Sequence, residues 1–148
     1  MVTMAEIDRS VLVNYSADQM YALVEDVAAY PEFLSWCSRG EVTLREPGRT
    51  IATLHIDFHG LRQHFTTDNA IRPSESIEMK LVSGPFRDLE GKWTFTALSE
   101  NACKVALKLK YHFSSALLEK TVGPVFHRIT DGFVEAFVRR AEEKFGAR

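Results

Sequence analysis

Two histidines and an aspartate alternate along one stretch of the sequence, at His55, Asp57 and His59, and another histidine follows at His64. On a β-strand alternate side chains share a face, so these groups could lie together and bind zinc or non-haem iron. The residues that alternate with them are apolar and are expected to face the core: Leu54, Ile56 and Phe58. We therefore place the histidines on the solvated face and predict no metal site.

The two cysteines, Cys37 and Cys103, are not spaced as metal ligands are. Cys37 has no neighbouring histidine or aspartate in the sequence to activate it as a nucleophile. The sequence also lacks the Gly-x-Ser-x-Gly nucleophile motif, the phosphate-binding loop and the dinucleotide-binding fingerprint. From the residues we predict no catalytic set and no cofactor, and hence a protein that is not an enzyme.

The size and composition fit one soluble globular domain. The chain has 148 residues, of which 45% are apolar and 26% charged, and its net charge is −2. The length suits a single domain over residues 1–148, and the charge excludes a global basic field for nucleic acid or an anionic membrane. With two thiols, no apolar leader and no apolar run of about 18 residues, we expect the protein in the cytoplasm.

The elements that must position these residues begin with a strand. Residues 5–14 alternate between apolar and polar side chains, which predicts that first strand. Ser16 and Gln19 then form a capping-box pattern that starts a short amphipathic helix. Pro31 suits the first position of a second short helix. That second helix is expected to carry three large apolar side chains: Phe33, Leu34 and Trp36.

In the middle of the chain the period of the apolar pattern changes to two. This predicts six further strands, at residues 40–46, 50–58, 62–72, 76–83, 86–97 and 103–113. The turns between them are short, so the strands are expected to pair antiparallel. Gly91 lies inside one of these strands and predicts a bulge or a sharp bend of the sheet.

The last quarter of the chain, Ser114–Arg148, has helical periodicity. Its apolar residues fall on one stripe: Val122, Val125, Phe126, Ile129, Phe133, Ala136 and Phe137. We predict a long helix laid across a curved sheet, an α+β arrangement. Such a stripe usually means filled core, but a lid-like turn at Gly84-Pro85 and small residues beside the phenylalanines favour a hollow. The small residues are Gly123, Gly132 and Ala136.

Three sequence motifs resemble those of the coenzyme-Q-binding START family. They are Val24–Cys37 with its Tyr30-Pro31-Glu32-Phe33-Leu34 centre, Gly84-Pro85-Phe86 followed by Leu89, Trp93 and Phe95, and Val125-Phe126 followed by Glu135–Ala141 and Phe145-Gly146. The resemblance covers essentially the whole chain. It implies a START-like helix-grip fold, in which a curved antiparallel sheet of about seven strands wraps around a long C-terminal helix, with two short helices after the first strand.

The resemblance also implies a hydrophobic tunnel between sheet and helix that binds ubiquinone or a related isoprenoid quinone. The protein would then be a non-enzymatic carrier that supports respiratory electron transport. The expected ligand-binding residues are mostly aromatic: Tyr30, Phe33, Leu34, Trp36, Phe58, Phe65, Phe86, Trp93, Tyr111, Phe126, Ile129, Phe133 and Phe137. Tyr111, Trp93 or Arg87 would donate to the ring carbonyls. A projecting isoprenoid tail implies peripheral contact with the inner membrane, with Tyr30–Trp36 as the rim.

The same family includes ribosome association toxins and polyketide cyclase-like proteins, which leaves two alternatives open. A regulator that binds the large ribosomal subunit and blocks subunit association needs a basic surface. The candidate residues for it are Lys104, Lys108, Lys110, Arg139, Arg140, Lys144 and Arg148. A polyketide cyclase or aromatase needs an inward-facing acid–base pair, which the sequence does not identify. The sequence also leaves the oligomeric state undetermined.

Overall fold

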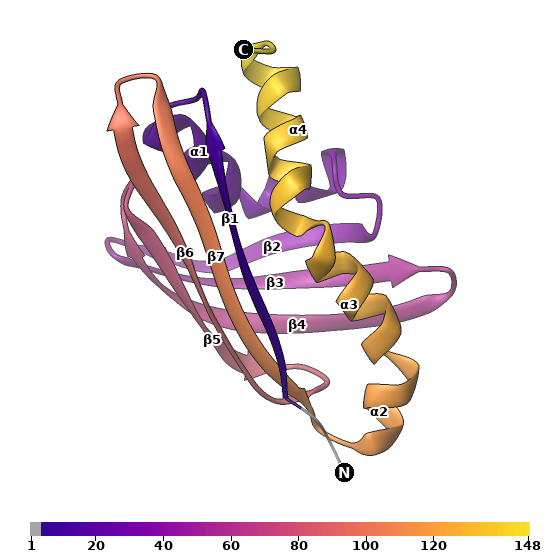
Figure 1. The fold of residues 1–148 in the computed structure, drawn as a ribbon. Coiled ribbons are helices and arrows are strands. Elements are labelled where there is room, and N and C mark those ends of the chain that lie inside the picture. Colours follow the sequence, from indigo (N-terminus) through magenta and orange to yellow (C-terminus); the bar gives the residue numbers. More distant parts are fainter. Residues whose placement is uncertain (1–3) are drawn as a thin grey trace.

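The structure is a computed structural model that describes residues 4–148, so residues 1–3 of the expected domain lie outside it. Seven antiparallel strands form one curved sheet in the order β1-β7-β6-β5-β4-β3-β2 (Figure 1). The strands are β1 (Ala5–Val13), β2 (Cys37–Glu46), β3 (Arg49–Phe58), β4 (Leu61–Arg72), β5 (Ser76–Ser83), β6 (Phe86–Ser99) and β7 (Ala102–Phe113). The helices are α1 (Ala17–Glu25), the 3₁₀ helix η1 (Val27–Glu32), α2 (Ala116–Thr121), α3 (Gly123–Asp131) and α4 (Phe133–Phe145). The predicted α+β helix-grip fold is confirmed.

The capping box at the start of α1 is present. The Ser16 hydroxyl accepts a hydrogen bond from the Gln19 backbone N–H at 3.0 Å, and the Gln19 side chain accepts one from the Ser16 N–H at 2.9 Å. Two backbone donors that the helix itself cannot satisfy thus gain partners. The local sequence therefore fixes where α1 begins.

The second short helix differs from its prediction. Pro31 lies near the end of η1 rather than at its start, and the three predicted apolar residues follow the helix. The backbone N–H groups of Phe33 and Leu34 both donate to the Tyr30 carbonyl, at 3.2 and 2.9 Å. The chain therefore turns around Tyr30 instead of continuing as a helix, and the large side chains after it point into the core.

Gly91 lies inside β6 without a bulge at that residue. Gly91 pairs in regular register with Met79 on β5 and Leu109 on β7, so the bulge interpretation is wrong. A Cβ at Gly91 would lie 2.9 Å from both the Leu109 Cδ1 and the Met79 Cε atoms. The glycine lets these two side chains close over the backbone. The irregularities of β6 lie nearer its ends, between Phe86 and Asp88 and between Ala97 and Ser99.

The predicted long helix is divided into α2, α3 and α4, which together cross the concave face of the sheet (Figure 1). Pro124 stands in the first turn of α3, where its missing N–H costs nothing and its ring prevents a continuous helix from α2. Gly132 separates α3 from α4, since glycine is among the weakest helix formers. The expectation of one unbroken helix was wrong at these two points.

Candidate ligand-binding cavity

A cavity of about 90 Å³ lies between the concave face of the sheet and helices α3 and α4. Side chains from α1, η1, five strands and the two helices surround it. Seven of the residues predicted to bind the ligand line it: Tyr30, Trp36, Phe65, Trp93, Phe126, Ile129 and Phe133. The hollow that the sequence favoured is therefore present, and half of the predicted set borders it.

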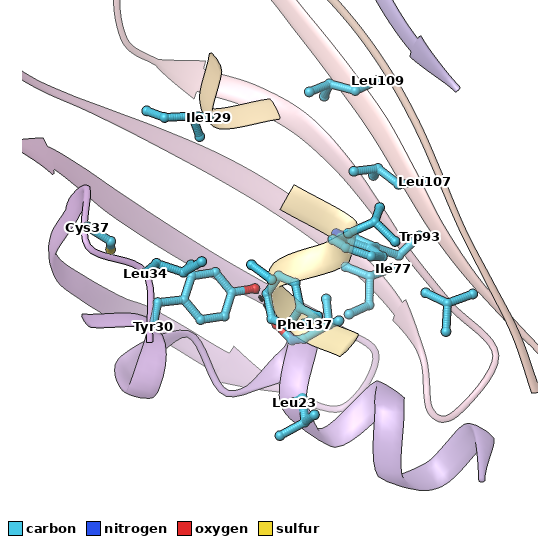
Figure 2. Packing of buried hydrophobic residues seen from close by; sticks show 14 of the residues in the cluster. Leu23, Tyr30, Leu34, Cys37, Ile77, Trp93, Leu107, Leu109, Ile129 and Phe137 are labelled. Carbon is cyan, nitrogen blue, oxygen red and sulfur yellow. Dashed lines mark hydrogen bonds between the residues drawn. The ribbon is translucent and has the colours of Figure 1, made fainter. Parts of the chain in front are cut away.

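The remaining predicted residues are Phe33, Leu34, Phe58, Phe86, Tyr111 and Phe137, and none of them lines the cavity. At one end, Phe137 is fully buried, with ring centroids 5.3 Å from Tyr30 and 5.4 Å from Trp93 (Figure 2). At the other end, Phe86 packs on Tyr111 at 5.9 Å and on Phe126 at 4.9 Å. The cavity thus lies between two filled aromatic clusters.

The other three predicted residues outside the lining, Phe33, Leu34 and Phe58, pack elsewhere in the protein. Phe33 packs against Phe137 at 5.1 Å, and Leu34 is buried in the core. Phe58 lies at the end of β3, its ring 4.2 Å from that of His59 in the turn. The predicted aromatic stripe is therefore partly filled core and partly cavity wall.

The space does not come from the small residues of the C-terminal helices. Gly123, Gly132 and Ala136 are not in the lining, and a Cβ at Gly132 would have no atom within 4 Å. The lining instead includes short side chains of β3 and β4: Thr50, Ala52, Thr67 and Asn69. Large apolar residues at these positions would fill the space above the centre of the sheet, whereas these shorter side chains leave a hollow there.

The His59-Gly60 turn is a sequence signal that could have placed these β3 and β4 residues opposite one another. His59 and Gly60 both have positive φ, at 50° and 84°, and form a two-residue turn after which Phe58 pairs with Leu61. Such a turn fixes the register of a hairpin. Thr50 must then face Asn69, and Ala52 must face Thr67, all on the side of the sheet that carries Ile56.

Three polar side chains of the lining form a hydrogen-bonded group, which we call the polar trio: Thr50, Thr67 and Asn69. All three are more than nine-tenths buried. The Thr67 hydroxyl donates to the Asn69 side-chain carbonyl at 2.9 Å, and the Asn69 amide N–H donates to the Thr50 hydroxyl oxygen at 3.2 Å. Burying polar groups among apolar ones is costly unless they are hydrogen-bonded, so these bonds hold the trio in place.

The ionisable residues at the cavity are not arranged for acid–base chemistry. The Tyr30 hydroxyl donates to the Val24 carbonyl at 2.5 Å, and burial raises the pKa of Tyr30 far above its usual range. Glu25 forms an ion pair with Arg45 on β2. Beside the lining, burial raises the pKa of Cys37 to about 11, so its thiol stays protonated at neutral pH.

Two of the three predicted donors for a ring carbonyl lie elsewhere. The Tyr111 hydroxyl is hydrogen-bonded to the His127 Nδ1 atom, and neither residue is part of the cavity lining. Arg87 is exposed and pairs with Asp88 at 3.7 Å. Trp93 does line the cavity, and among residues 4–148 its indole N–H has no hydrogen-bond partner.

The histidines of β3 and β4 lie on the face of the sheet opposite the cavity. His55 Nε2 is 2.7 Å from Glu41 Oε1, and the His55 ring stacks on that of His64 at 5.5 Å. Their neighbour Ile56 points the other way and is buried. Within residues 4–148 no three His, Cys, Asp or Glu side chains are grouped as metal ligands.

The predicted membrane rim and lid are both packed into the protein. Tyr30, Leu34 and Trp36 are at least nine-tenths buried, so they offer no apolar surface. At the turn before β6, the Pro85 carbonyl accepts from the Ser114 N–H at 3.0 Å, and a Cβ at Gly84 would lie 2.6 Å from the Phe65 Cβ. This turn is therefore held against β4 and β7. No helix among the described residues is long and apolar enough to cross a bilayer.

The candidate basic surface on the convex face is divided by carboxylates. Lys110 lies 3.8 Å from Glu6, and Lys108 pairs in register with Asp8 on β1. At the C-terminal end, Arg140 forms an ion pair with Glu32 at 2.7 Å. Like charges do meet at one point, where Lys108 pairs in register with Lys92 on β6, so among the described residues the sheet carries lysines interspersed with carboxylates.

The fold is that of a START-like domain, with a largely apolar cavity between its sheet and C-terminal helices. The sequence profile of the family described as polyketide cyclase/dehydrase and lipid transport matches residues 13–138. The chain belongs to this family, and it is similar to a protein of Vibrio cholerae named ribosome association toxin RatA. The two are 45% identical over 143 residues, 97% of this chain and 99% of the toxin.

More distant similarities connect the chain to binders and to enzymes. It is 27% identical to coenzyme Q-binding protein COQ10 homolog B of Xenopus laevis, over 95% of this chain and 59% of that one. The crystal structure of the Zhui aromatase/cyclase of a Streptomyces species superposes with a TM-score of 0.81 and 17% identity, over 97% and 96% of the two chains. A START superfamily structure from Mycobacterium smegmatis superposes with a TM-score of 0.75 and 20% identity, over 93% of this chain and 97% of that one. At such identities the solved structures establish the fold alone.

Proposed function

We propose that this protein binds a neutral, largely apolar ligand of the isoprenoid-quinone class and carries it without transforming it. The observation that carries this proposal is the apolar cavity between the sheet and helices α3 and α4, with a buried polar trio in its wall. Burial of apolar surface contributes about 25 cal/mol per Å², so a quinone ring and tail gain affinity with few polar contacts. The coenzyme Q-binding relative supports the same ligand class.

The size of the cavity restricts how such a ligand binds. Its volume of about 90 Å³ is well below the roughly 300–1,000 Å³ of typical small-molecule sites. The wall must therefore move outward, and the tail extends beyond it. Met79, which lines the cavity, is flexible and suited to repacking. We place the carrier in the cytoplasm, in peripheral contact with the inner membrane where it exchanges its ligand.

Catalysis is not part of this proposal. The likeness to an aromatase/cyclase rests on the fold, and the two ionisable groups in the lining, Glu25 and Tyr30, are each committed to a partner within the protein. Neither is arranged as an acid facing a base across the cavity. A polyketide cyclase requires such a pair to move protons during ring closure.

The carrier hypothesis is tested by what the purified protein binds. Native mass spectrometry and solvent extraction should reveal a co-purifying isoprenoid quinone, and a ubiquinone with a single isoprene unit should bind saturably in titrations of tryptophan fluorescence, since Trp36 and Trp93 line the cavity. The proposal fails if the protein carries no quinone and the titration shows no saturable binding.

A second function, association with the large ribosomal subunit, is favoured by one observation. The relative at 45% identity over nearly the whole of both chains is named a ribosome association toxin. Blocking subunit association in this way would use the outer surface rather than the cavity. Co-sedimentation with purified large subunits, weakening steeply with salt, would support it. Absence of the protein from the ribosomal pellet at low salt would contradict it.

A further inference from the structure

The polar trio is unusual because of where it lies. Thr50, Thr67 and Asn69 come from β3 and β4, and all three face the cavity rather than solvent. Mostly apolar side chains from β5 to β7, α3 and α4 form the other walls. Three adjacent apolar residues at these positions would have filled the hollow at no polar cost. The trio therefore places three hydrogen-bonding side chains together on the β3–β4 side of a largely apolar cavity.

The two hydrogen bonds inside the trio leave two of its N–H and O–H donors without an acceptor. Thr67 donates to the Asn69 carbonyl, and one Asn69 N–H donates to the Thr50 oxygen. A primary amide has two N–H donors and a hydroxyl has one. Among residues 4–148 the second Asn69 N–H and the Thr50 O–H have no acceptor. Both of these groups are hydrogen-bond donors, so a ligand satisfies them with an acceptor oxygen.

The charges around the cavity restrict that acceptor to a neutral group. No lysine, arginine or histidine lines the cavity within residues 4–148. Arg45 forms an ion pair with Glu25, which lines the cavity, and so is already committed to a carboxylate. An anionic carboxylate or phosphate would lose its hydration without gaining a counter-charge, which is strongly unfavourable. A neutral carbonyl or ether oxygen carries no such cost.

We propose that the polar trio is the recognition site for an acceptor oxygen of a neutral apolar ligand, with the second Asn69 N–H and the Thr50 O–H as the donors. This inference rests on the proposed binding of a ligand in the cavity, and it specifies the contact that selects the ligand. A ring carbonyl satisfies both donors. A pure hydrocarbon leaves them unpaired, as they are in the empty cavity.

The test compares two probes of the same shape. Duroquinone is a fully methylated benzoquinone without a tail, and durene is the hydrocarbon with the same ring and methyl groups. Each is titrated into the wild-type protein and into Asn69→Leu and Thr50→Val, with binding followed by methyl NMR. Thr66→Val is the matched control, because Thr66 and Thr53 form the same kind of cross-strand contact, at 2.6 Å, on the opposite face of the same two strands.

The wild-type protein and Thr66→Val should bind duroquinone more tightly than durene. Asn69→Leu and Thr50→Val should each lose about 3- to 10-fold in duroquinone affinity, the worth of a neutral hydrogen bond, and none in durene affinity. If Asn69→Leu does not fold, Thr50→Val decides, because it is nearly isosteric and keeps the Thr67–Asn69 bond.

Unchanged duroquinone affinity in Thr50→Val and in any folded Asn69→Leu would overturn the inference while leaving the cavity as a binding site. Failure of the wild-type protein to bind either probe would instead overturn the proposed function itself. Tetramethylbenzoate tests the neutrality of the ligand. Binding of this anion more tightly than duroquinone would also overturn the inference.

Discussion

Two phenylalanines one turn apart on α4 have different roles. Phe133 lines the cavity, whereas Phe137 is fully buried between Tyr30, Phe33 and Trp93. Their spacing in the sequence is that of one helical stripe, and the stripe alone could not separate them. Both rings contact Trp93, at 5.8 and 5.4 Å, but only Phe133 also borders the cavity.

The two rings should therefore respond differently to truncation. Phe137→Ala should lower the free energy of unfolding by about 3–5 kcal/mol, the cost of removing a core phenylalanine. Phe133→Ala should cost less and should change ligand affinity, because it enlarges the cavity. Urea unfolding together with a ubiquinone titration measures both. Equal destabilisation by the two variants, with ligand affinity unchanged in Phe133→Ala, would show that this part of the stripe is ordinary core.

The buried thiol of Cys37 should make stability depend on alkaline pH. Burial raises its pKa from the ordinary 9.0 to about 11, so the folded protein keeps a proton that the unfolded chain releases. This contribution is complete below about pH 9 and is lost as the pH rises toward 11. Between about pH 9 and 10, below the ordinary range of tyrosine, Cys37→Ala should lose less unfolding free energy than the wild type. Parallel losses in the two proteins would contradict the assignment.

At the scale of elements, local rules succeeded where the signal was local. Alternation located every strand of the sheet, and the Ser16–Gln19 capping box located the start of α1. The C-terminal helix was predicted too long because its apolar period continues through Pro124 and Gly132, where the backbone does not. The cavity wall at Thr50 and Asn69 depends on how β3 pairs with β4. The alternation within each single strand does not predict this pairing.

Substituting alanine for Gly91 and for Gly132 should have opposite effects on stability, because only Gly91 lies in close contact with other residues. A Cβ at Gly91 would lie 2.9 Å from two side chains and 3.1 Å from the Lys108 carbonyl oxygen, so Gly91→Ala should be destabilising. Gly132 has a φ of −106°, and a Cβ there would meet nothing within 4 Å. Gly132→Ala should raise the free energy of unfolding by about 0.4–1 kcal/mol by restricting the unfolded chain. Thermal melts of both variants check this, and destabilisation by Gly132→Ala would contradict it.

For the whole molecule, the two faces of the sheet suit different tasks. The concave face and helices α3 and α4 enclose the cavity, with a filled aromatic cluster at each end. The convex face carries charges of both signs, as in the pair of Glu6 and Lys110. The two functions proposed above are therefore compatible, since one uses the cavity inside the sheet and the other the outer surface.

The central claim is that a neutral apolar ligand enters the cavity between the sheet and the C-terminal helices. The most direct measurement is a methyl NMR titration of the wild-type protein with a ubiquinone of one isoprene unit. We predict saturable shifts at the cavity-lining methyl groups of Ile77, Met79 and Ile129, and none at the exposed methyl groups of Leu12 and Leu98. Shifts confined to the exposed methyl groups, or no saturable shift at all, would contradict the account.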